Sequence, residues 1–292
     1  MSDLQSEGGA SSSEAHTSME SQLFGAPVTV EDSEEVKRLI GLVGAEPFSY
    51  SLRISLGDAL CSQLRYLEAI NQYSIAIGLD AKNITGYYKR AQRYLCVHQF
   101  HKSLADYCVC AMALPKRFDF NYKIGLLWYF LEQYEKAIEY FDAAESYSQN
   151  GEMRIAVVYW RHFARMRCGK SEGNDAQRSL FSLQPGMNAG HHESYLTAIE
   201  FFREEYTYAE VAEILKEQKS DIDYVTILYA VYRVLCLSKD DERAMMILKE
   251  LLKRNFHWPS FSYVAAFNDY RKSPYGMAES YTEYAARSAI LD

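Results

Sequence analysis

The sequence predicts an all-α protein built from antiparallel helix pairs, and three observations carry this prediction. Apolar residues recur at helical spacing through most of the chain, as in residues 66–83, where Ala69, Tyr73 and Ala76 share one face. Glycine and proline are sparse and mostly fall between such segments. The pattern also recurs every 34 residues, with small residues on a face where leucine or isoleucine would bury more area.

The 34-residue register is carried by small and aromatic positions. Two steps along the chain take the triplet Ala69, Tyr73 and Ala76 first to Ser103, Tyr107 and Cys110, and then to Ala137, Phe141 and Ala144. The preceding helix keeps the same register, because Gly57 maps to Ala91 and then to Gly125. Helices that pack about 8–10 Å apart need small side chains where they cross. The alanines therefore predict close helix contacts, with the aromatic ring filling the wedge between them.

This period, with small residues around an aromatic one, resembles the tetratricopeptide repeat (TPR). The residues that carry the resemblance are Gly57, Ala69, Tyr73 and Ala76 in the first unit, Ala91, Ser103, Tyr107, Cys110 and Pro115 in the second, and Gly125, Ala137, Phe141 and Ala144 in the third. The resemblance implies a right-handed α-solenoid of antiparallel helix pairs with a C-terminal capping helix. A single pair cannot bury its apolar face alone, so the units stack.

Five segments are expected along the chain. Residues 1–30 are rich in serine, glycine and glutamate and predict a disordered acidic tail. Residues 31–46 predict an N-terminal helix that ends before Pro47. Three regular TPR units are expected over 50–149, and degenerate TPR-like pairs with a capping helix over 150–271. For the C-terminal tail, 272–292, a helix and a frayed end both stay open.

The degenerate region keeps parts of the pattern. Trp160, Phe163, Ala164, Ala176 and Leu180 fit a fourth unit that is displaced by five residues from the strict frame. Residues 195–202 and 208–215 predict a shorter helix pair. A later unit is expected from Leu228, Val231, Leu235, Ala244, Leu248 and Leu251, followed by a closing helix over 259–272.

Charge and cysteine usage restrict the kinds of partner. The formal net charge is −8, and residues 1–46 hold nine acidic and two basic residues, which leaves the rest near −1. No basic surplus is present for nucleic acid, so no nucleic-acid partner is expected. No apolar run approaches the length of a membrane span. Six cysteines without CxxC spacing predict reduced thiols, and together these features favour the cytoplasm.

Residue types that could carry chemistry are present but do not converge. His98 and His101 fall in a turn, where solvated loop histidines are expected rather than metal ligands. Cys108 and Cys110 point to different sides of one helix, and Cys110 is accounted for as a small packing residue. No phosphate-binding or nucleophile motif appears. We therefore expect no catalytic residue, no metal and no cofactor, and a protein that is not an enzyme.

In TPR arrays the first helix of each unit lines a concave groove, and the resemblance places a peptide-binding surface there. The groove candidates are Tyr88, Lys89, Gln92, Tyr122, Lys123, Leu126, Tyr129, Arg161 and Arg165. For any of these, and Leu126 above all, a place in the core between helices is the competing interpretation. Tyrosines bury a large area at low entropic cost. The expected ligand is a hydrophobic or aromatic peptide whose acidic residues meet Lys89, Lys123 and Arg161.

The leading functional hypothesis is a scaffold or adaptor that holds a peptide or helix of a partner protein. One TPR subclass clamps the C-terminal carboxylates of chaperones, but Asp58 and Asp119 stand at its basic or amide positions, so that clamp is not expected here. One alternative is a self-associating protein whose exposed tyrosines bury in a homodimer. Another is a regulator of a hydrolase or protease that resembles bacterial TPR lipoprotein adaptors. The acidic tail, through Leu23 and Phe24, is a further hypothetical occupant of the groove.

Overall fold

The computed structural model describes residues 31–170, 179–183 and 187–273. Within these ranges the chain forms helices joined by turns, without a strand, which confirms the all-α prediction. The expected acidic tail with Leu23 and Phe24, the position of Ala176 and residues 274–292 of the C-terminal tail lie outside the described residues.

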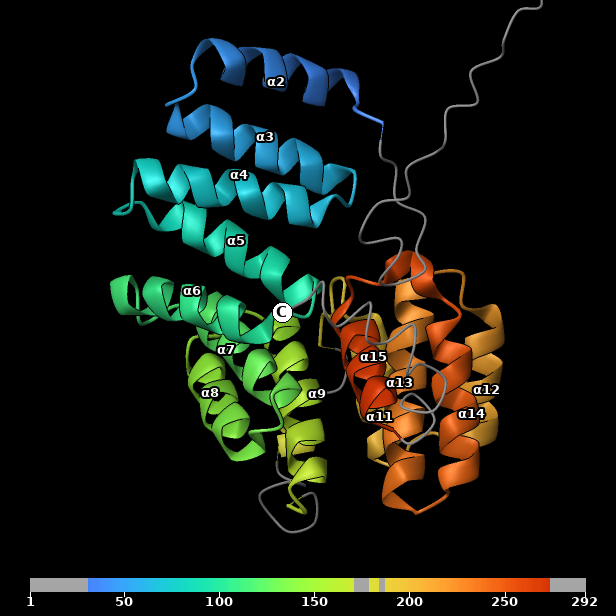
Figure 1. The fold of residues 1–292 in the computed structure, drawn as a ribbon. Helices are drawn as coiled ribbons and strands as arrows, with labels where there is room; N and C mark the ends of the chain where they lie inside the picture. Colours follow the sequence, from blue (N-terminus) through green and yellow to red (C-terminus); the bar gives the residue numbers. More distant parts are fainter. Residues whose placement is uncertain (1–30, 171–178, 184–186, 274–292) are drawn as a thin grey trace, which may run out of the picture.

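The helices of the N-terminal half are α2 (Glu34–Ala45), α3 (Tyr50–Ser62), α4 (Tyr66–Leu79), α5 (Ile84–Cys96), α6 (Phe100–Ala113), α7 (Phe118–Phe130), α8 (Tyr134–Ser146) and α9 (Gly151–Arg167). Short polar side chains start several of them. Ser33 caps α2 by accepting the Val36 N–H at 3.3 Å, and Asn83 caps α5 by accepting the Thr85 N–H at 3.1 Å. The pairs α3–α4, α5–α6 and α7–α8 pack closely, and each pair stacks on the next (Figure 1). The structure is thus the predicted TPR-like α-solenoid.

The small residues lie where the helices cross. Ala69 and Ala76 are fully buried, and the Tyr73 ring lies between their helix and α3. A Cβ atom added at Gly57 would stand 2.4 Å from Tyr73 Cε1, so only glycine admits the ring there. Gly125 repeats this relation in the third unit, where an added Cβ would stand 2.7 Å from Phe141 Cε1. Close packing therefore explains the alanine and glycine positions of the repeat.

The 34-residue period is also present in the backbone. Leu64, His98 and Glu132 end the first helix of successive units, and each has a positive φ of about 60°. The residue that follows each of them donates its N–H across the turn, as in Arg65 N to Leu60 O at 3.0 Å. This is the Schellman arrangement, which usually takes glycine at the left-handed position. Glu204 and Lys239 end later helices in the same way.

Replacing Lys239 by glycine is therefore expected to stabilise the protein. Lys239 has φ of 59° and is exposed, so glycine would remove the left-handed penalty without losing buried contacts. The expected gain is about 1 kcal/mol, or roughly 2 °C in the midpoint of thermal unfolding. Lys239→Ala keeps the Cβ atom and serves as the control. An equal gain from alanine would assign the effect to the lysine side chain instead of the backbone.

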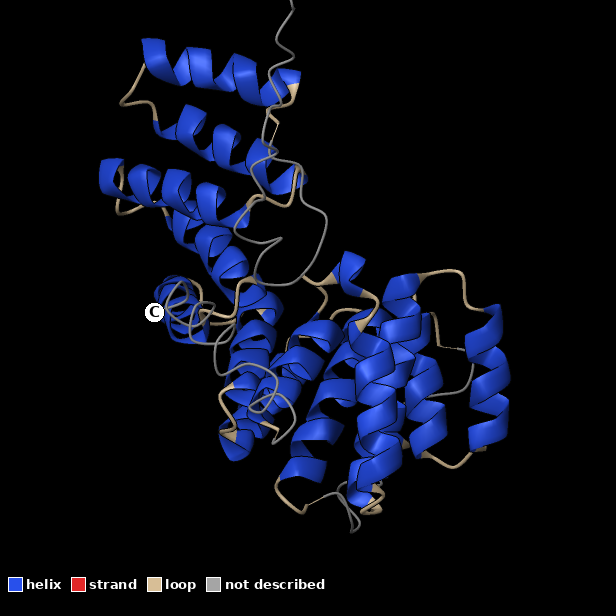
Figure 2. Cartoon of the chain, turned by 45° about the vertical axis from the view of Figure 1, so that its right-hand side comes forward, coloured by secondary structure: helices blue, strands red, loops and turns tan. Residues whose placement is uncertain are grey.

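The C-terminal half is less regular. It contains α11 (Glu193–Phe202), α12 (Tyr208–Glu217), α13 (Asp221–Leu237), α14 (Asp241–Leu252), a short 3-10 turn η1 (Asn255–His257) and α15 (Phe261–Lys272). Helix α11 packs against α9 and α13, whereas α12 packs against α13 and α13 pairs with α14. These helices form a second group beside α9 (Figures 1 and 2). A bundle around α13 thus continues the solenoid.

Helix α15 does more than cover the last pair. It packs on α13 and α14, as a capping helix does, but it also reaches back to the regular repeats. Asn268 Nδ2 donates to the Phe130 carbonyl at the end of α7, at 3.0 Å. The Phe267 ring centroid lies 5.2 Å from that of His98 in the α5–α6 turn. His98 is consequently buried, which corrects the expectation of a solvated loop histidine.

A buried ion cluster joins α15 to α9 and α13. Asp269 accepts hydrogen bonds from Arg167 Nη1 at 3.1 Å and from the Tyr229 hydroxyl at 3.2 Å, and Arg233 Nη1 lies 3.6 Å away. The Asp269 side chain is 8% exposed. These contacts fix α15 relative to α9, the last helix of the N-terminal half, and to α13.

Candidate functional site

The groove candidates occupy three helices. Tyr88, Lys89 and Gln92 lie on α5, Tyr122, Lys123, Leu126 and Tyr129 on α7, and Arg161 and Arg165 on α9. The structure does not bring them together as one open surface, because the faces of α7 and α9 are largely covered. Among the pockets that the described residues form, one is lined by two of the candidates, Gln92 and Lys123.

Several of the candidates belong to the core. Tyr122, Leu126 and Tyr129 are buried, and the Tyr129 hydroxyl is 2.7 Å from that of Tyr229 on α13. Arg161 is also buried. These side chains pack between helices, so for them the structure matches the competing interpretation of core residues.

Two of the three cations that were expected to meet an acidic ligand already form ion pairs within the chain. Arg161 Nη1 lies 2.6 Å from both the Asp142 and the Glu145 carboxylates. Lys89 Nζ lies 2.8 Å from both oxygens of Asp58. Asp58 is thereby neutralised. Lys123 is the remaining cation of the three.

The other two candidates do not line the pocket. Tyr88 is half-buried on α5, where its ring meets Tyr107 edge-on with 6.2 Å between the ring centroids. Arg165 is half-buried near the end of α9.

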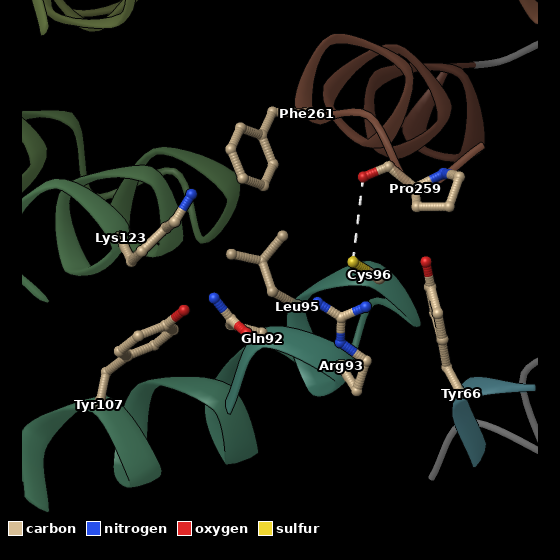
Figure 3. Close-up of a pocket in the computed structure, with 9 residues that line it drawn as sticks. All are labelled: Tyr66, Gln92, Arg93, Leu95, Cys96, Tyr107, Lys123, Pro259 and Phe261. Atoms are coloured by element: carbon tan, nitrogen blue, oxygen red, sulfur yellow. Dashed lines mark hydrogen bonds between the residues drawn. The ribbon is translucent and has the colours of Figure 1, made fainter. Parts of the chain in front are cut away.

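The pocket lies between α5, α6, α7 and the segment that leads into α15 (Figure 3). Its volume is about 250 Å³, and its lining is Tyr66, Gln92, Arg93, Leu95, Cys96, Tyr107, Lys123, Pro259 and Phe261. The C-terminal segment closes one side, because Cys96 Sγ is 3.9 Å from the Pro259 carbonyl and the Trp258 ring packs on Tyr66 with centroids 5.2 Å apart. Part of the concave side of the repeats is thus covered by this chain's own aromatic residues.

Two cations face this pocket. The Arg93 guanidinium carbon lies 4.6 Å from the centroid of the Tyr66 ring, and Lys123 Nζ lies 4.0 Å from that of Phe261. Among the described residues, neither forms an ion pair with a carboxylate. Cation–π contacts of this kind stabilise a cation only modestly. The pocket therefore carries a net positive charge.

Burial and the neighbouring Arg93 act in the same direction on Lys123. Burial, with a smaller contribution from Arg93, lowers the pKa of Lys123 to about 8, although Cys96 and Asp119 oppose the shift. Asp119 itself is near Arg117, with 3.9 Å between the charged atoms. An ammonium held in such surroundings gains from a new anionic neighbour.

Tyr107 contributes an unpaired hydroxyl. The side chain is fully buried, and its oxygen has no hydrogen-bond partner among the described residues. Figure 3 shows the hydroxyl directed toward the space between Gln92 and Lys123. Burial raises the pKa of Tyr107 well above its ordinary value, so the hydroxyl stays protonated and can donate.

The sequence pattern missed most of the pocket. Arg93 stands four residues after Lys89 and therefore on the same face of α5, a signal that was available. Pro259 and Phe261 gave no such signal, because they lie more than a hundred residues from the helices they contact. No group of three or more His, Cys, Asp or Glu side chains in the described part of the chain is placed to hold a metal ion. None of the described helices has the length and apolarity to cross a membrane.

Comparison with known proteins supports the fold. No protein-family model matches the chain, and no curated protein does. A solved TPR protein from Parabacteroides merdae is similar over 80% of this chain and 91% of its own, with 20% identity and a TM-score of 0.56. YrrB, described as a TPR protein with an unusual peptide-binding site, matches 80% of this chain and 98% of its own at 14% identity and a TM-score of 0.43. The chain has the fold of TPR proteins.

Proposed function

We propose that this protein is a non-catalytic scaffold that binds a peptide or helix of a partner protein on the concave side of α5 and α7. The observation that supports it most is the pocket of Figure 3, which lies on a repeat fold. It combines aromatic walls with two cations that have no carboxylate partner among the described residues. A concave site with a few convergent polar groups is the usual form of a binding site. A peptide could extend from this pocket along α5, past Gln92 toward Tyr88.

The cytoplasm is the location that we propose for this activity. All six cysteines are unpaired, and Cys108 is exposed. Free exposed thiols are typical of a reducing compartment.

Self-association is less well supported than partner binding. That alternative depends on exposed tyrosines, but Tyr66, Tyr73, Tyr107, Tyr122 and Tyr129 are all buried within the chain itself. Among the tyrosines that the structure describes, Tyr208 stands out as substantially exposed. A regulator of a hydrolase or protease is one form that the proposed scaffold could take, and the identity of the partner decides it.

The proposal is tested by blocking the pocket with a neutral side chain. The full chain and its Gln92→Trp variant are used to capture partners from the native cell, and the captured proteins are identified by mass spectrometry. Gln92 is half-buried and lines the pocket, so an indole there should fill the cavity and reduce capture by about tenfold or more. Lys82→Trp, on the exposed α4–α5 turn, is the matched control. Undiminished capture by Gln92→Trp would place the binding surface elsewhere.

A further inference from the structure

The pocket between α5, α7 and the C-terminal segment has a charge imbalance that its own residues do not correct. Arg93 and Lys123 both face it, and each packs against an aromatic ring, Tyr66 and Phe261 respectively. A cation removed from water is stabilised chiefly by an opposite charge with good hydrogen-bond geometry. The arrangement therefore favours an anionic occupant.

The buried hydroxyl of Tyr107 is the second, independent observation. Buried polar atoms are nearly always hydrogen-bonded, and an orphaned one costs free energy. The Tyr107 oxygen has no partner among the described residues and points into the same pocket (Figure 3). A ligand oxygen placed between this hydroxyl and Lys123 would satisfy both.

Size and wall chemistry restrict the anion. The cavity of about 250 Å³ is slightly smaller than ordinary small-molecule sites of about 300–1,000 Å³, so it fits one side chain or the end of a chain. Tyr66, Leu95 and Phe261 provide apolar walls beside the cations. A carboxylate on a short aliphatic or aromatic group matches this combination of charge and apolar surface.

We propose that this pocket binds a carboxylate of a peptide, with Lys123 and Arg93 as charged donors and the Tyr107 hydroxyl as a neutral donor. The carboxylate is that of an aspartate or glutamate side chain or of a free chain end. The inference rests on the proposed function and adds the chemical group that anchors the partner. The site uses Phe261 and Pro259 from outside the repeats, and Arg93 and Tyr107 in addition to Lys123.

The test begins with three small probes, two that carry a carboxylate and one that carries none. N-acetyl-phenylalanine carries a free chain end, N-acetyl-glutamate α-amide carries a side-chain carboxylate, and N-acetyl-phenylalanine amide carries neither. Amide resonances of the 15N-labelled full chain are followed by NMR during titration. At least one of the two acids should shift resonances around the pocket in α5 and α7 and saturate, about tenfold or more tighter than the uncharged amide. The acid that binds identifies the source of the carboxylate.

Variants then assign the donors. Lys123→Met is expected to weaken binding of the acid by about tenfold or more, because it removes a charge-assisted hydrogen bond. Lys82→Met, on the exposed α4–α5 turn, should leave the affinity unchanged. Tyr107→Phe is the variant that separates binding from folding. This substitution should weaken binding of the acid by about threefold to tenfold. The free protein should be as stable as the wild type or more so, because an unsatisfied hydroxyl is removed.

Three results would overturn the inference: equal binding of the acid and the amide, unchanged affinity in both Lys123→Met and Tyr107→Phe, or tighter binding of phenyl phosphate than of either acid. Failure of the two proposals can be told apart. If partner capture is lost in Gln92→Trp but neither acid binds, the proposed scaffold function is supported and the proposed carboxylate site is rejected. If an acid binds as expected but Gln92→Trp captures partners normally, the carboxylate site is supported and the partner-binding surface lies elsewhere.

Discussion

Replacing Asp269 by asparagine is expected to lower the free energy of unfolding by about 3–5 kcal/mol. Asp269 is the carboxylate shared by Arg167 and Arg233, and it also accepts the Tyr229 hydroxyl. The Arg233 side chain is 9% exposed and has no other carboxylate within ion-pair distance among the described residues. Asparagine keeps the shape but leaves this guanidinium buried without an opposite charge, which is why the expected loss is large.

Urea unfolding of the full chain measures this loss, and hydrogen exchange of α15 shows where it acts. Glu132→Gln is the matched control, because Glu132 also contacts Arg167, at 3.4 Å, but is 42% exposed. Its loss should stay below about 1 kcal/mol. Arg233→Met in the Asp269→Asn background should restore part of the stability, since it removes the uncompensated charge. A loss in Asp269→Asn no larger than that in Glu132→Gln would contradict a structural role for the cluster.

This cluster also determines how firmly the candidate pocket is closed. Helix α15 begins at Phe261, whose ring covers Lys123, and Asp269 holds the same helix two turns later. Loosening α15 should therefore expose the concave side of α5 and α7. Partner binding and the position of α15 are expected to be coupled in this protein, because both use the same surface.

The regular repeats could be predicted because their constraints are local and recur. A ring at Tyr73 or Phe141 requires a residue without a Cβ atom opposite it, and Gly57 and Gly125 meet this requirement at the same spacing. Each unit repeats the same helix crossing. The interpretation of any one position can therefore be checked against the equivalent positions 34 residues away. The helix pairs α3–α4, α5–α6 and α7–α8 show this repetition in the structure.

The candidate site could be predicted only in part, because the deciding contacts are not local. The residue pattern places Tyr122, Leu126 and Tyr129 on the inner helix of their unit, but it cannot tell an open face from a covered one. Helix α9 and the bundle around α13 cover that face, and Tyr229 lies a hundred residues beyond its partner Tyr129. The contact of Pro259 with Cys96 joins residues 163 positions apart and leaves no periodic signal.

Ion pairs between distant residues likewise could not be predicted from the sequence. The basic residues expected to attract an acidic ligand were identified by position, without knowledge of which carboxylates stand beside them. Lys89 is paired with Asp58 from the preceding unit, whereas Lys123 faces Phe261. Only the three-dimensional arrangement distinguishes a cation that is already compensated from one that is available.

Lowering the pH from 7 to 5 is expected to remove about 2 kcal/mol of stability for each of two buried histidines. Burial, with a smaller effect of Arg271, lowers the pKa of His98 from its ordinary 6.5 to about 3. Burial, with a smaller effect of Arg165, lowers the pKa of His162 to about 4. Between pH 6.5 and these values the unfolded chain binds protons that the folded chain does not. Stability is therefore full above pH 6.5 and falls as the pH drops, until the folded-state pKa is reached.

The loss at His98 should act on α15 first, because the His98 ring contacts Phe267 of that helix as well as Phe100. A protonated imidazole between two phenyl rings lacks the water that stabilises its charge, so the contact opens before the repeats unfold.

The measurement is urea unfolding at pH 7 and 5, together with hydrogen exchange of α15. His98→Asn suits the left-handed backbone at this position, where φ is 60°. It should remove about half of the pH-dependent loss, whatever its effect on stability at pH 7. His101→Asn, on the exposed side of α6, should keep the full loss. An unchanged pH dependence in His98→Asn would mean that other groups, and not the histidine between α5 and α15, set the acid sensitivity of this fold.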